Sequence, residues 1–360
     1  MFLSLTDRLI AGIAAEGPIT VAAFMDICLN DAQDGYYATR PRLGSQGDFI
    51  TAPHVSQMFG ELIGLWALGI WQQLGKPCRV RLVEMGPGDG TLIGDLLRSA
   101  RAFAPFCDAI DLWLVEPSLP LRGLQQAVLA GVAEARWTGS LAEIPRDVPI
   151  ILLANEVLDC LPISQFQKTG LGWRERCIGT DRQAALTWVL SDSAATFAGE
   201  PWQSAQIGSV CETSMALVDM GLAISNVIAT TGGAALMIDY GRAEPGFGDT
   251  LQALSRHKKQ SPLQSPGEAD LTAHVDFPNF LAAVRRGGAV QTVLATQGDF
   301  LRALGIVVRA KVLATANPKQ ADLINRQVDR LISAEGMGEL FKVACIYGHS
   351  ERPPGFEVPE

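Results

Sequence analysis

The stretch Glu84-Met85-Gly86-Pro87-Gly88-Asp89-Gly90-Thr91 decides the fold of this 360-residue chain. It follows the mainly apolar run 80–83, which is typical of a buried strand. It precedes residues 92–98, whose apolar positions recur at helical spacing. A strand, a glycine-rich turn and a helix in this order bring backbone N–H groups and a helix N-terminus against a ligand. The sequence therefore predicts a nucleotide-type binding site at residues 84–91.

The spacing of the glycines indicates which ligand the turn binds. A dinucleotide-binding turn has the pattern G-x-G-x-x-G, and its third glycine would fall at position 91, where this chain has Thr91. Here an acid, Glu84, ends the strand, and Gly86, Gly88 and Gly90 follow it. This variant suits a nucleoside that carries an amino-acid tail, so the predicted cofactor is S-adenosylmethionine. A dinucleotide and a purely structural turn are the alternatives.

Composition and charge narrow the classes of function. The formal net charge of −9 argues against a nucleic-acid partner and is compatible with a cationic protein substrate. The seven cysteines form no C-x-x-C pair, and the four histidines lack metal-ligand spacing, so we expect reduced thiols and no metal. No apolar segment is long enough for a membrane span, and the N-terminus resembles neither a secretory signal nor a transit peptide. We expect a bacterial cytoplasmic protein without membrane insertion.

Strands and helices are expected to alternate along most of the chain. The predicted strands are 80–84, 110–116, 134–138, 149–154, 232–240, 289–294 and 341–347. The predicted helices are 3–15, 19–30, 56–75, 91–102, 119–130, 203–230, 276–286 and 317–334. Alternation of this kind predicts a mostly parallel, doubly wound α/β sheet of the Rossmann type. Residues 241–272 are expected to be a long polar loop, which in compact domains often acts as a lid.

We divide the chain into three parts on this basis. Residues 1–77 are a helical N-terminal region that covers the cofactor site. Residues 78–347 are the Rossmann-like domain, with insertions near 163–230, where short β-rich runs appear, and near 241–275. The tail 348–360 is rich in proline and glutamate and is expected to be flexible.

Polar side chains at the ends of the predicted strands are the candidate site residues. Ligands of a doubly wound sheet bind at the carboxyl ends of its strands. Glu116 ends the second strand, where a carboxylate can accept both ribose hydroxyls. Asn155, Glu156 and Asp159 follow the fourth strand, and Asp239 ends the fifth. A carboxylate pair beside a transferable methyl group suits a guanidinium acceptor, so Glu156, Asp159 and Asp239 are the candidate catalytic residues.

A second polar group lies upstream, in the glycine-bounded segment 47–61 that opens a helix. Segments before the first strand of such folds often cover the cofactor. The candidate substrate-binding residues there are Asp48, Thr51, Gln57 and Glu61. The alternative is a capped helix with a solvated Glu61, and His54 is interpreted as incidental rather than as a general base.

With these residues in hand, the chain resembles the MidA-like family of class I S-adenosylmethionine-dependent methyltransferases. That family includes the mitochondrial protein arginine methyltransferase required for assembly of respiratory complex I. The motifs that carry the resemblance are Asp34-Gly35-Tyr36-Tyr37, the segment 47–53, Ser56-Gln57-x-Phe59-Gly60-Glu61, the glycine-rich turn 84–91, Asn155-Glu156-x-x-Asp159-x-Leu161-Pro162, Ile238-Asp239-Tyr240-Gly241 and the segment 266–277. Their order and spacing together are specific, and they cover residues 4–347.

The resemblance implies a Rossmann-like sheet with an antiparallel last strand, and family-specific insertions. It implies that Glu84, Gly86, Gly88, Gly90, Thr91, Glu116 and Asn155 bind the cofactor. It also implies that Thr272 and His274, in the segment 266–277, line the acceptor site. The implied reaction is symmetric dimethylation of an arginine on a complex I subunit. His54 and Asp89 depart from the family pattern, in which many members have a glutamate or serine and an arginine.

Two other functions stay open at this point. An assembly factor could keep the cofactor pocket and hold a client subunit without turnover, and the acidic surface fits that hypothesis equally well. A dinucleotide-dependent oxidoreductase is disfavoured by Thr91. The sequence leaves the oligomeric state undetermined, a homodimer included.

Overall fold

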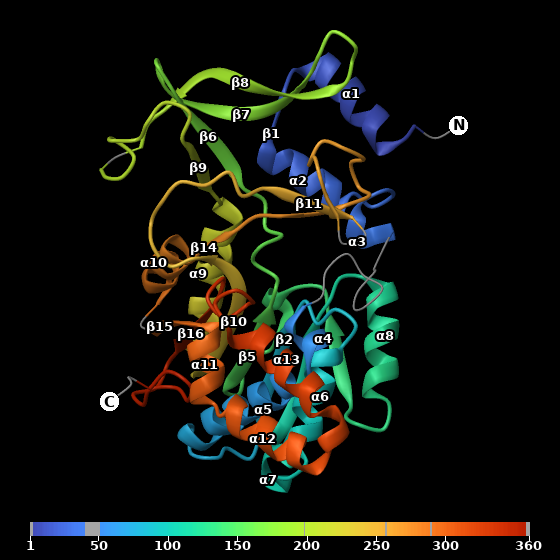
Figure 1. Cartoon of the computed structure of the whole chain (residues 1–360), viewed down its shortest axis with the longest axis vertical. Helices are drawn as coiled ribbons and strands as arrows, with labels where there is room; N and C mark the ends of the chain where they lie inside the picture. The colour runs from blue at the N-terminus through green and yellow to red at the C-terminus, as the bar shows by residue number, and fades with distance from the viewer. Residues whose placement is uncertain (1–2, 40–50, 198, 256–257, 289, 358–360) are drawn as a thin grey trace.

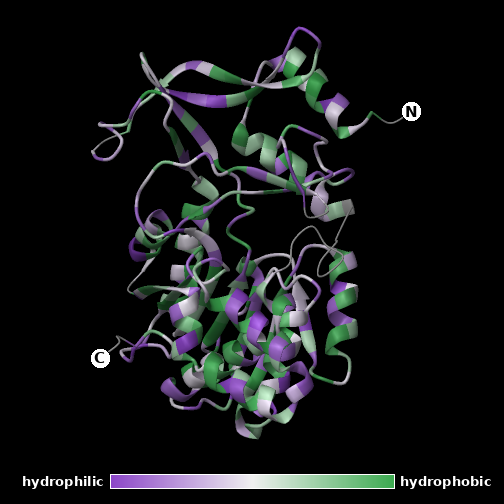
Figure 2. Ribbon diagram, in the orientation of Figure 1, coloured by the Kyte–Doolittle hydropathy of each residue, from purple (hydrophilic) through white to green (hydrophobic). Residues whose placement is uncertain are grey.

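Two layers make up the structure, a computed structural model that describes residues 3–39, 51–197, 199–255, 258–288 and 290–357. The lower half in Figure 1 holds a large sheet with its helices, and the upper half holds shorter strands with the N-terminal helices. Figure 2 shows hydrophilic and hydrophobic positions mixed along the helices of the lower half, as expected of helices that bury one face. No helix in the described ranges is long and apolar enough to cross a membrane.

The large sheet has the strand order β15-β16-β10-β5-β2-β3-β4. Its strands are β2 (Val80–Met85), β3 (Ile110–Val115), β4 (Ala135–Thr138), β5 (Ile150–Asn155), β10 (Gly233–Arg242), β15 (Gln291–Thr296) and β16 (Phe341–Tyr347). Neighbours from β4 to β10 pair in parallel, whereas β16 is antiparallel to both β10 and β15. The predicted α/β class, with a mostly parallel sheet and an antiparallel last strand, is confirmed.

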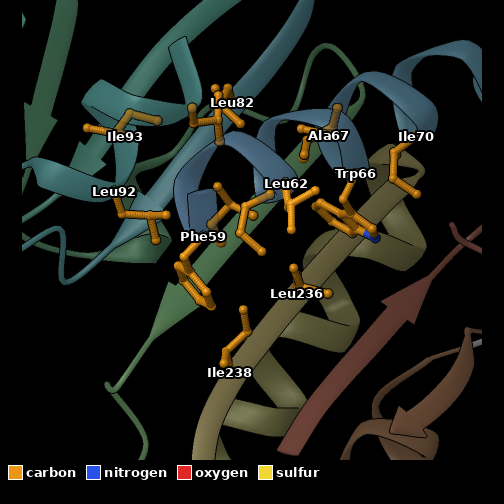
Figure 3. Packing of buried hydrophobic residues seen from close by; sticks show 14 of the residues in the cluster. Phe59, Leu62, Trp66, Ala67, Ile70, Leu82, Leu92, Ile93, Leu236 and Ile238 are labelled. Atoms are coloured by element: carbon orange, nitrogen blue, oxygen red, sulfur yellow. The ribbon is translucent and has the colours of Figure 1, made fainter. Parts of the chain in front are cut away.

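Helices cover both faces of this sheet, which explains why its central strands are mainly apolar. The helices are α5 (Gln57–Gln73), α6 (Thr91–Ala100), α8 (Leu119–Leu129), α9 (Met215–Thr231), α10 (Phe277–Gly287), α11 (Gln297–Ala303), α12 (Ile306–Ala316) and α13 (Ala321–Ile332). Phe59, Leu62 and Trp66 of α5 are buried beside Leu236 and Ile238 of β10 (Figure 3). The packing of α5 on the sheet fixes the position of the segment that precedes it, which borders the site.

The upper layer combines the N-terminal helices with the insertions. Its elements are α1 (Leu5–Glu16), β1 (Ile19–Thr20), α2 (Val21–Asn30), α3 (Tyr36–Thr39), β6 (Ser164–Thr169), β7 (Gly172–Thr180), β8 (Leu186–Ala195), β9 (Val210–Thr213), β11 (Gln252–Ser255), β12 (Lys258–Gln260) and β13 (Asp270–Thr272). One hydrophobic cluster joins α1 and α2 to Ile178 of β7 and Leu271 of β13. The structure thus divides the region 1–77 between two cores, because α1 and α2 pack on the insertions and α5 packs on the large sheet.

Three expectations were wrong. The helix predicted for 203–230 begins only at Met215, because Val210–Thr213 pairs with β6 as strand β9. The loop predicted for 241–272 contains a three-stranded sheet, in which β11 pairs with β12 and β13. The described part of the tail is packed: Phe356 is 4% exposed and its ring lies 5.0 Å from that of Phe300.

Candidate active site

The glycine-rich turn between β2 and α6 has a left-handed backbone. Gly86, Gly88 and Gly90 have φ angles of 60°, 57° and 86°, a region that β-branched or bulky residues rarely adopt. The turn is closed by the Gly90 N–H, which donates to the Pro87 carbonyl at 2.8 Å. The Thr91 N–H donates to Asp89 Oδ1 at 3.0 Å, which completes the start of α6. Backbone atoms without side chains in front of them therefore border the space at the carboxyl end of β2.

That space is a cleft at the carboxyl ends of β2, β3 and β5, formed by two adjoining cavities of about 340 and 90 Å³. Its lining joins the ends of these strands to Tyr36 and Tyr37 of α3. The residues that line both cavities are Thr51, Gly86, Gly88 and Glu156. The combined volume is in the range of small-molecule sites. The position agrees with the rule that ligands of doubly wound sheets bind at this edge.

The smaller cavity contains buried acceptor atoms. Glu84 is 2% exposed, and among the described residues its Oε2 has no hydrogen-bond partner. Burial, together with the nearby Asp89 carboxylate, raises the pKa of Glu84 to about 8. Asn155 Oδ1 is also buried without a partner in the described part of the chain. Because buried polar atoms are normally paired, these acceptors fit a ligand with several N–H donors, such as an ammonium group.

The larger cavity is bordered by Glu116, which is buried at the end of β3. Its Oε1 accepts from the Ser118 N–H at 2.8 Å, and its Oε2 from Gln125 Nε2 at 3.3 Å. Burial raises the pKa of Glu116. Since a carboxylate offers about four lone-pair positions, both oxygens can still accept from ribose hydroxyls.

Gln125 is a site residue that the sequence reasoning missed. Its Nε2 also donates to the Gly88 carbonyl at 2.8 Å, and its Oε1 accepts from Trp137 Nε1 at 2.7 Å. One buried amide thus joins the glycine-rich turn, Glu116 and β4. The sequence did contain a signal for this role, because Gln125 lies on the buried face of α8, where an apolar residue is usual. Trp137 orients this amide.

Glu156 occupies the turn after β5 and borders both cavities. Its φ of 54° is left-handed, a conformation that costs about 1–3 kcal/mol in a residue other than glycine and is concentrated at functional sites. Its Oε1 accepts from Asn155 Nδ2 at 3.0 Å and from the Ala52 N–H at 3.3 Å. Burial and the Asp159 carboxyl raise the pKa of Glu156 to about 7. A carboxyl with this pKa can exchange a proton near neutral pH.

Asp159 and Asp239 are close but differ in what they face. Asp159 is buried and lines the cleft, and burial raises its pKa to about 6. Asp239 Oδ2 instead accepts from the N–H groups of Val157, Leu158 and Asp159, at 3.1, 2.8 and 3.2 Å. The structure therefore places Asp239 behind the turn, where it fixes the backbone that carries Glu156.

Thr51 and His54 bring the upstream segment to the cleft. Thr51 lines both cavities, and its Oγ1 lies 2.8 Å from His54 Nδ1. His54 Nε2 lies 2.9 Å from Asp89 Oδ2, so α4 (Ala52–Val55) is tied to the glycine-rich turn. The hydrogen bond with Asp89 raises the pKa of His54. The two positions that depart from the family pattern are thus direct partners.

Two of the predicted substrate residues on α5 point elsewhere. Gln57 is exposed, and its Nε2 donates to Glu61 Oε1 at 3.3 Å. Glu61 forms an ion pair with Arg309 of α12 at 2.7 Å. Neither residue lines the cleft. Asp48, which comes from the same upstream segment, lies outside the described residues.

Thr272 and His274 lie beside the acceptor end without lining the cleft. Thr272 is 2% exposed on β13 and faces the Tyr240 hydroxyl. His274 borders a smaller cavity on the other side of Asp159, and its N–H donates to Thr250 Oγ1 at 2.9 Å. The neighbouring residues that do line the cleft are Asn30, Tyr36, Tyr37, Cys160 and Asp270. Tyr36, Tyr37 and Asp270 lie in the motif 34–37 and the segment 266–277 that carry the family resemblance, but none of the five was a candidate site residue.

A comparison with protein families identifies the ligand of the cleft. Residues 62–294 match a family described as "putative S-adenosyl-L-methionine-dependent methyltransferase". The chain belongs to this methyltransferase family. The predicted cofactor, S-adenosylmethionine, is confirmed in place of a dinucleotide. The unpaired acceptors at Glu84 and Asn155 fit the ammonium group of its methionine portion, and the Glu116 carboxylate fits its ribose.

Known relatives and solved structures agree with this assignment. The methyltransferase is 36% identical to protein arginine methyltransferase NDUFAF7, mitochondrial, of Bos taurus and 35% identical to that of Homo sapiens; each alignment covers 95% of this chain and 83% of the relative. A crystal structure of a "likely methyl transferase from Burkholderia thailandensis bound to S-adenosyl-homocysteine" superposes with a TM-score of 0.84 at 26% identity, covering 98% of this chain and 93% of that chain. The cofactor product in that structure is the one expected after methyl transfer.

Proposed function

We propose that this methyltransferase methylates a guanidino nitrogen of a protein arginine. The observation that carries the proposal is the composition of the cleft beyond the cofactor end, where the carboxyls of Glu156, Asp159 and Asp270 line the same space as the rings of Tyr36 and Tyr37. Carboxylates bind the planar guanidinium through paired hydrogen bonds, and aromatic faces attract it. The relatives named protein arginine methyltransferases also support it.

The side chains around the acceptor supply positioning and charge control. When bound, S-adenosylmethionine supplies an electrophilic methyl group on a sulfonium. Glu156 would hold the acceptor by its carboxylate, because the left-handed turn points this side chain into both cavities. As the N–C bond forms and the S–C bond breaks, the acceptor nitrogen loses a proton, which the Glu156 carboxylate can accept. A pKa of about 7 suits that exchange at neutral pH.

We further propose, from the family resemblance, that the acceptor is a subunit of respiratory complex I and that the product is symmetric dimethylarginine. The net charge of −9 is compatible with an arginine-rich segment of a partner protein. A cytoplasmic location and the catalytic or binding roles given to individual residues stay predictions.

Methyl transfer into a lysate tests the proposed reaction. The protein is incubated with methyl-labelled S-adenosylmethionine and a lysate of a strain that lacks this gene, and the labelled band is hydrolysed for amino-acid analysis. Label in symmetric dimethylarginine on one respiratory-complex band supports the proposal. Cofactor binding with no label above a Gly88→Val control would contradict it and favour an assembly factor that works without turnover.

A further inference from the structure

Two segments that are distant in the sequence meet at the outer wall of the cleft. One is the turn before β13, and the other is the segment 34–37 that leads into α3. Gly267 has a φ of 79°, and a Cβ atom at this position would lie only 2.2 Å from the Asp34 carbonyl oxygen. The Tyr37 hydroxyl then donates to Asp270 Oδ1 at 3.3 Å. This close contact sets the position of Asp270.

Asp270 is also fixed relative to the carboxyls on the large sheet. The Ala273 N–H donates to the Asp159 carbonyl at 2.9 Å, so the end of β13 lies beside the turn that follows β5. Asp159, Asp270 and Tyr37 all line the larger cavity. A carboxyl from the upper layer and a carboxyl from the large sheet therefore border one space, which continues into the cofactor end of the cleft.

The walls of this space combine carboxyl groups with aromatic rings. Tyr36 and Tyr37 both line this space, with ring centroids 5.4 Å apart at an interplanar angle of 75°. A guanidinium has five N–H donors in a plane and can bridge separated carboxylates while it stacks on a ring. An ammonium has three donors on one atom and is more strongly hydrated. Burial and the nearby Asp270 raise the pKa of Tyr37, so its phenol stays a donor and orients the Asp270 carboxylate at neutral pH.

We propose that Asp270, oriented by the Tyr37 hydroxyl, is a specificity-determining residue of the acceptor site and selects a guanidinium over an ammonium. Through Asp270, the three-stranded sheet contributes to recognition and is not merely a cover. The inference rests on the proposed function and deepens it, since it names the group that separates arginine from lysine acceptors.

Binding of small cations to the full chain tests the proposal without the natural acceptor. The protein is saturated with S-adenosylhomocysteine and titrated with n-butylguanidinium or n-butylammonium by calorimetry or NMR. Asp270→Asn should weaken n-butylguanidinium binding by roughly 10- to 100-fold, the factor expected for one lost charge-assisted hydrogen bond. Tyr37→Phe should cause a smaller loss, and affinity for S-adenosylhomocysteine should not change. Asp192→Asn is the matched control, because Asp192 is exposed on β8.

Failure of this inference and failure of the proposed function give different results. If wild-type and Asp270→Asn proteins bind n-butylguanidinium equally, or if the wild type does not prefer it to n-butylammonium, the role of Asp270 is wrong even when arginine is labelled in the lysate. If the preference is present and depends on Asp270, the inference holds. The absence of labelled arginine would then contradict only the reaction. Should Asp270→Asn fail to fold, the comparison of Tyr37→Phe with wild type decides, and an unchanged preference would overturn the proposal.

Discussion

Substitution of Glu84 by glutamine tests two effects of one buried carboxyl, namely its effect on cofactor affinity and its effect on the stability of the fold. In the unliganded protein the carboxyl holds a proton below a pKa of about 8, because it is buried beside Asp89. An ammonium ligand needs the ionised form, so binding must release this proton. Affinity for S-adenosylhomocysteine should therefore rise with pH until the amino group of the ligand itself loses its proton.

The size of the effect follows from the two pKa values. With Glu84 at about 8 and a free α-amino group also near 8, the fraction of ionised carboxyl multiplied by the fraction of protonated amine rises roughly 20-fold between pH 6 and pH 7.5. Stability changes in the opposite direction. Because the folded state holds the proton more tightly than the unfolded state, the free energy of unfolding falls as pH rises from 4.5 through 8. The loss has an upper limit of about 5 kcal/mol.

Calorimetry at pH 6.0, 6.75 and 7.5, in two buffers with different ionisation enthalpies, measures affinity and proton release together. Wild type should bind S-adenosylhomocysteine more tightly as pH rises, and at pH 6 it should release close to one proton per ligand bound. Glu84→Gln should bind more weakly at pH 7.5, with a flatter profile, and should unfold at a higher denaturant concentration than unliganded wild type at pH 8.5. Parallel pH profiles for the two proteins would refute the assignment of Glu84 to the ammonium group.

Three further substitutions test other parts of the structure. Gly88→Val puts a β-branched side chain at a φ of 57°, so thermal stabilisation by S-adenosylhomocysteine should disappear while the circular dichroism spectrum persists; retained stabilisation would exclude this site. Glu156→Gln should leave cofactor affinity within about twofold but reduce methyl transfer by roughly 100-fold or more, and unchanged turnover would remove its role as the base. Phe356→Ala should lower the free energy of unfolding by about 3–5 kcal/mol in a urea titration, because the Phe356 ring is buried against Phe300. Glu351→Ala is the control, since Glu351 is exposed in the same tail. A loss no larger than that of the control would show that the tail does not contribute to stability.

The large sheet could be predicted from the sequence because its signals are local. Each central strand is a mainly apolar run, and the apolar residues of the helices between the strands recur at helical spacing. Strands β9, β11, β12 and β13 have no such pattern, since each has three or four residues and polar members such as Gln252 and Lys258. Their pairing depends on partners far along the chain, such as β6 for β9. The prediction for the tail was wrong for a similar reason. Its overall composition is typical of a flexible segment, but its one phenylalanine, Phe356, packs on Phe300 of α11.

Some residues of the candidate site could likewise be predicted from the sequence, and others could not. The glycine-rich turn and the acids at strand ends could be found because the topology of a doubly wound sheet brings strand ends together. The contact between Asp270 and Tyr37 could not be found, because it requires the insertion and the N-terminal helices to be placed first. The family resemblance indicated only the segments that contain these two residues. Asp239 was assigned to the acceptor from its place at a strand end. Its carboxylate turns instead toward three backbone N–H groups, which sequence alone does not show.

A crystal structure of this protein with S-adenosylhomocysteine and an arginine-containing peptide would test the central claim most directly. We predict the ligand ammonium within hydrogen-bond distance of Glu84, the ribose hydroxyls on Glu116, and a guanidinium between Glu156 and Asp270 with one nitrogen facing the sulfur. An adenosine group bound away from Glu116, or a guanidinium bound outside the cleft that Glu156 and Asp270 share, would contradict this account.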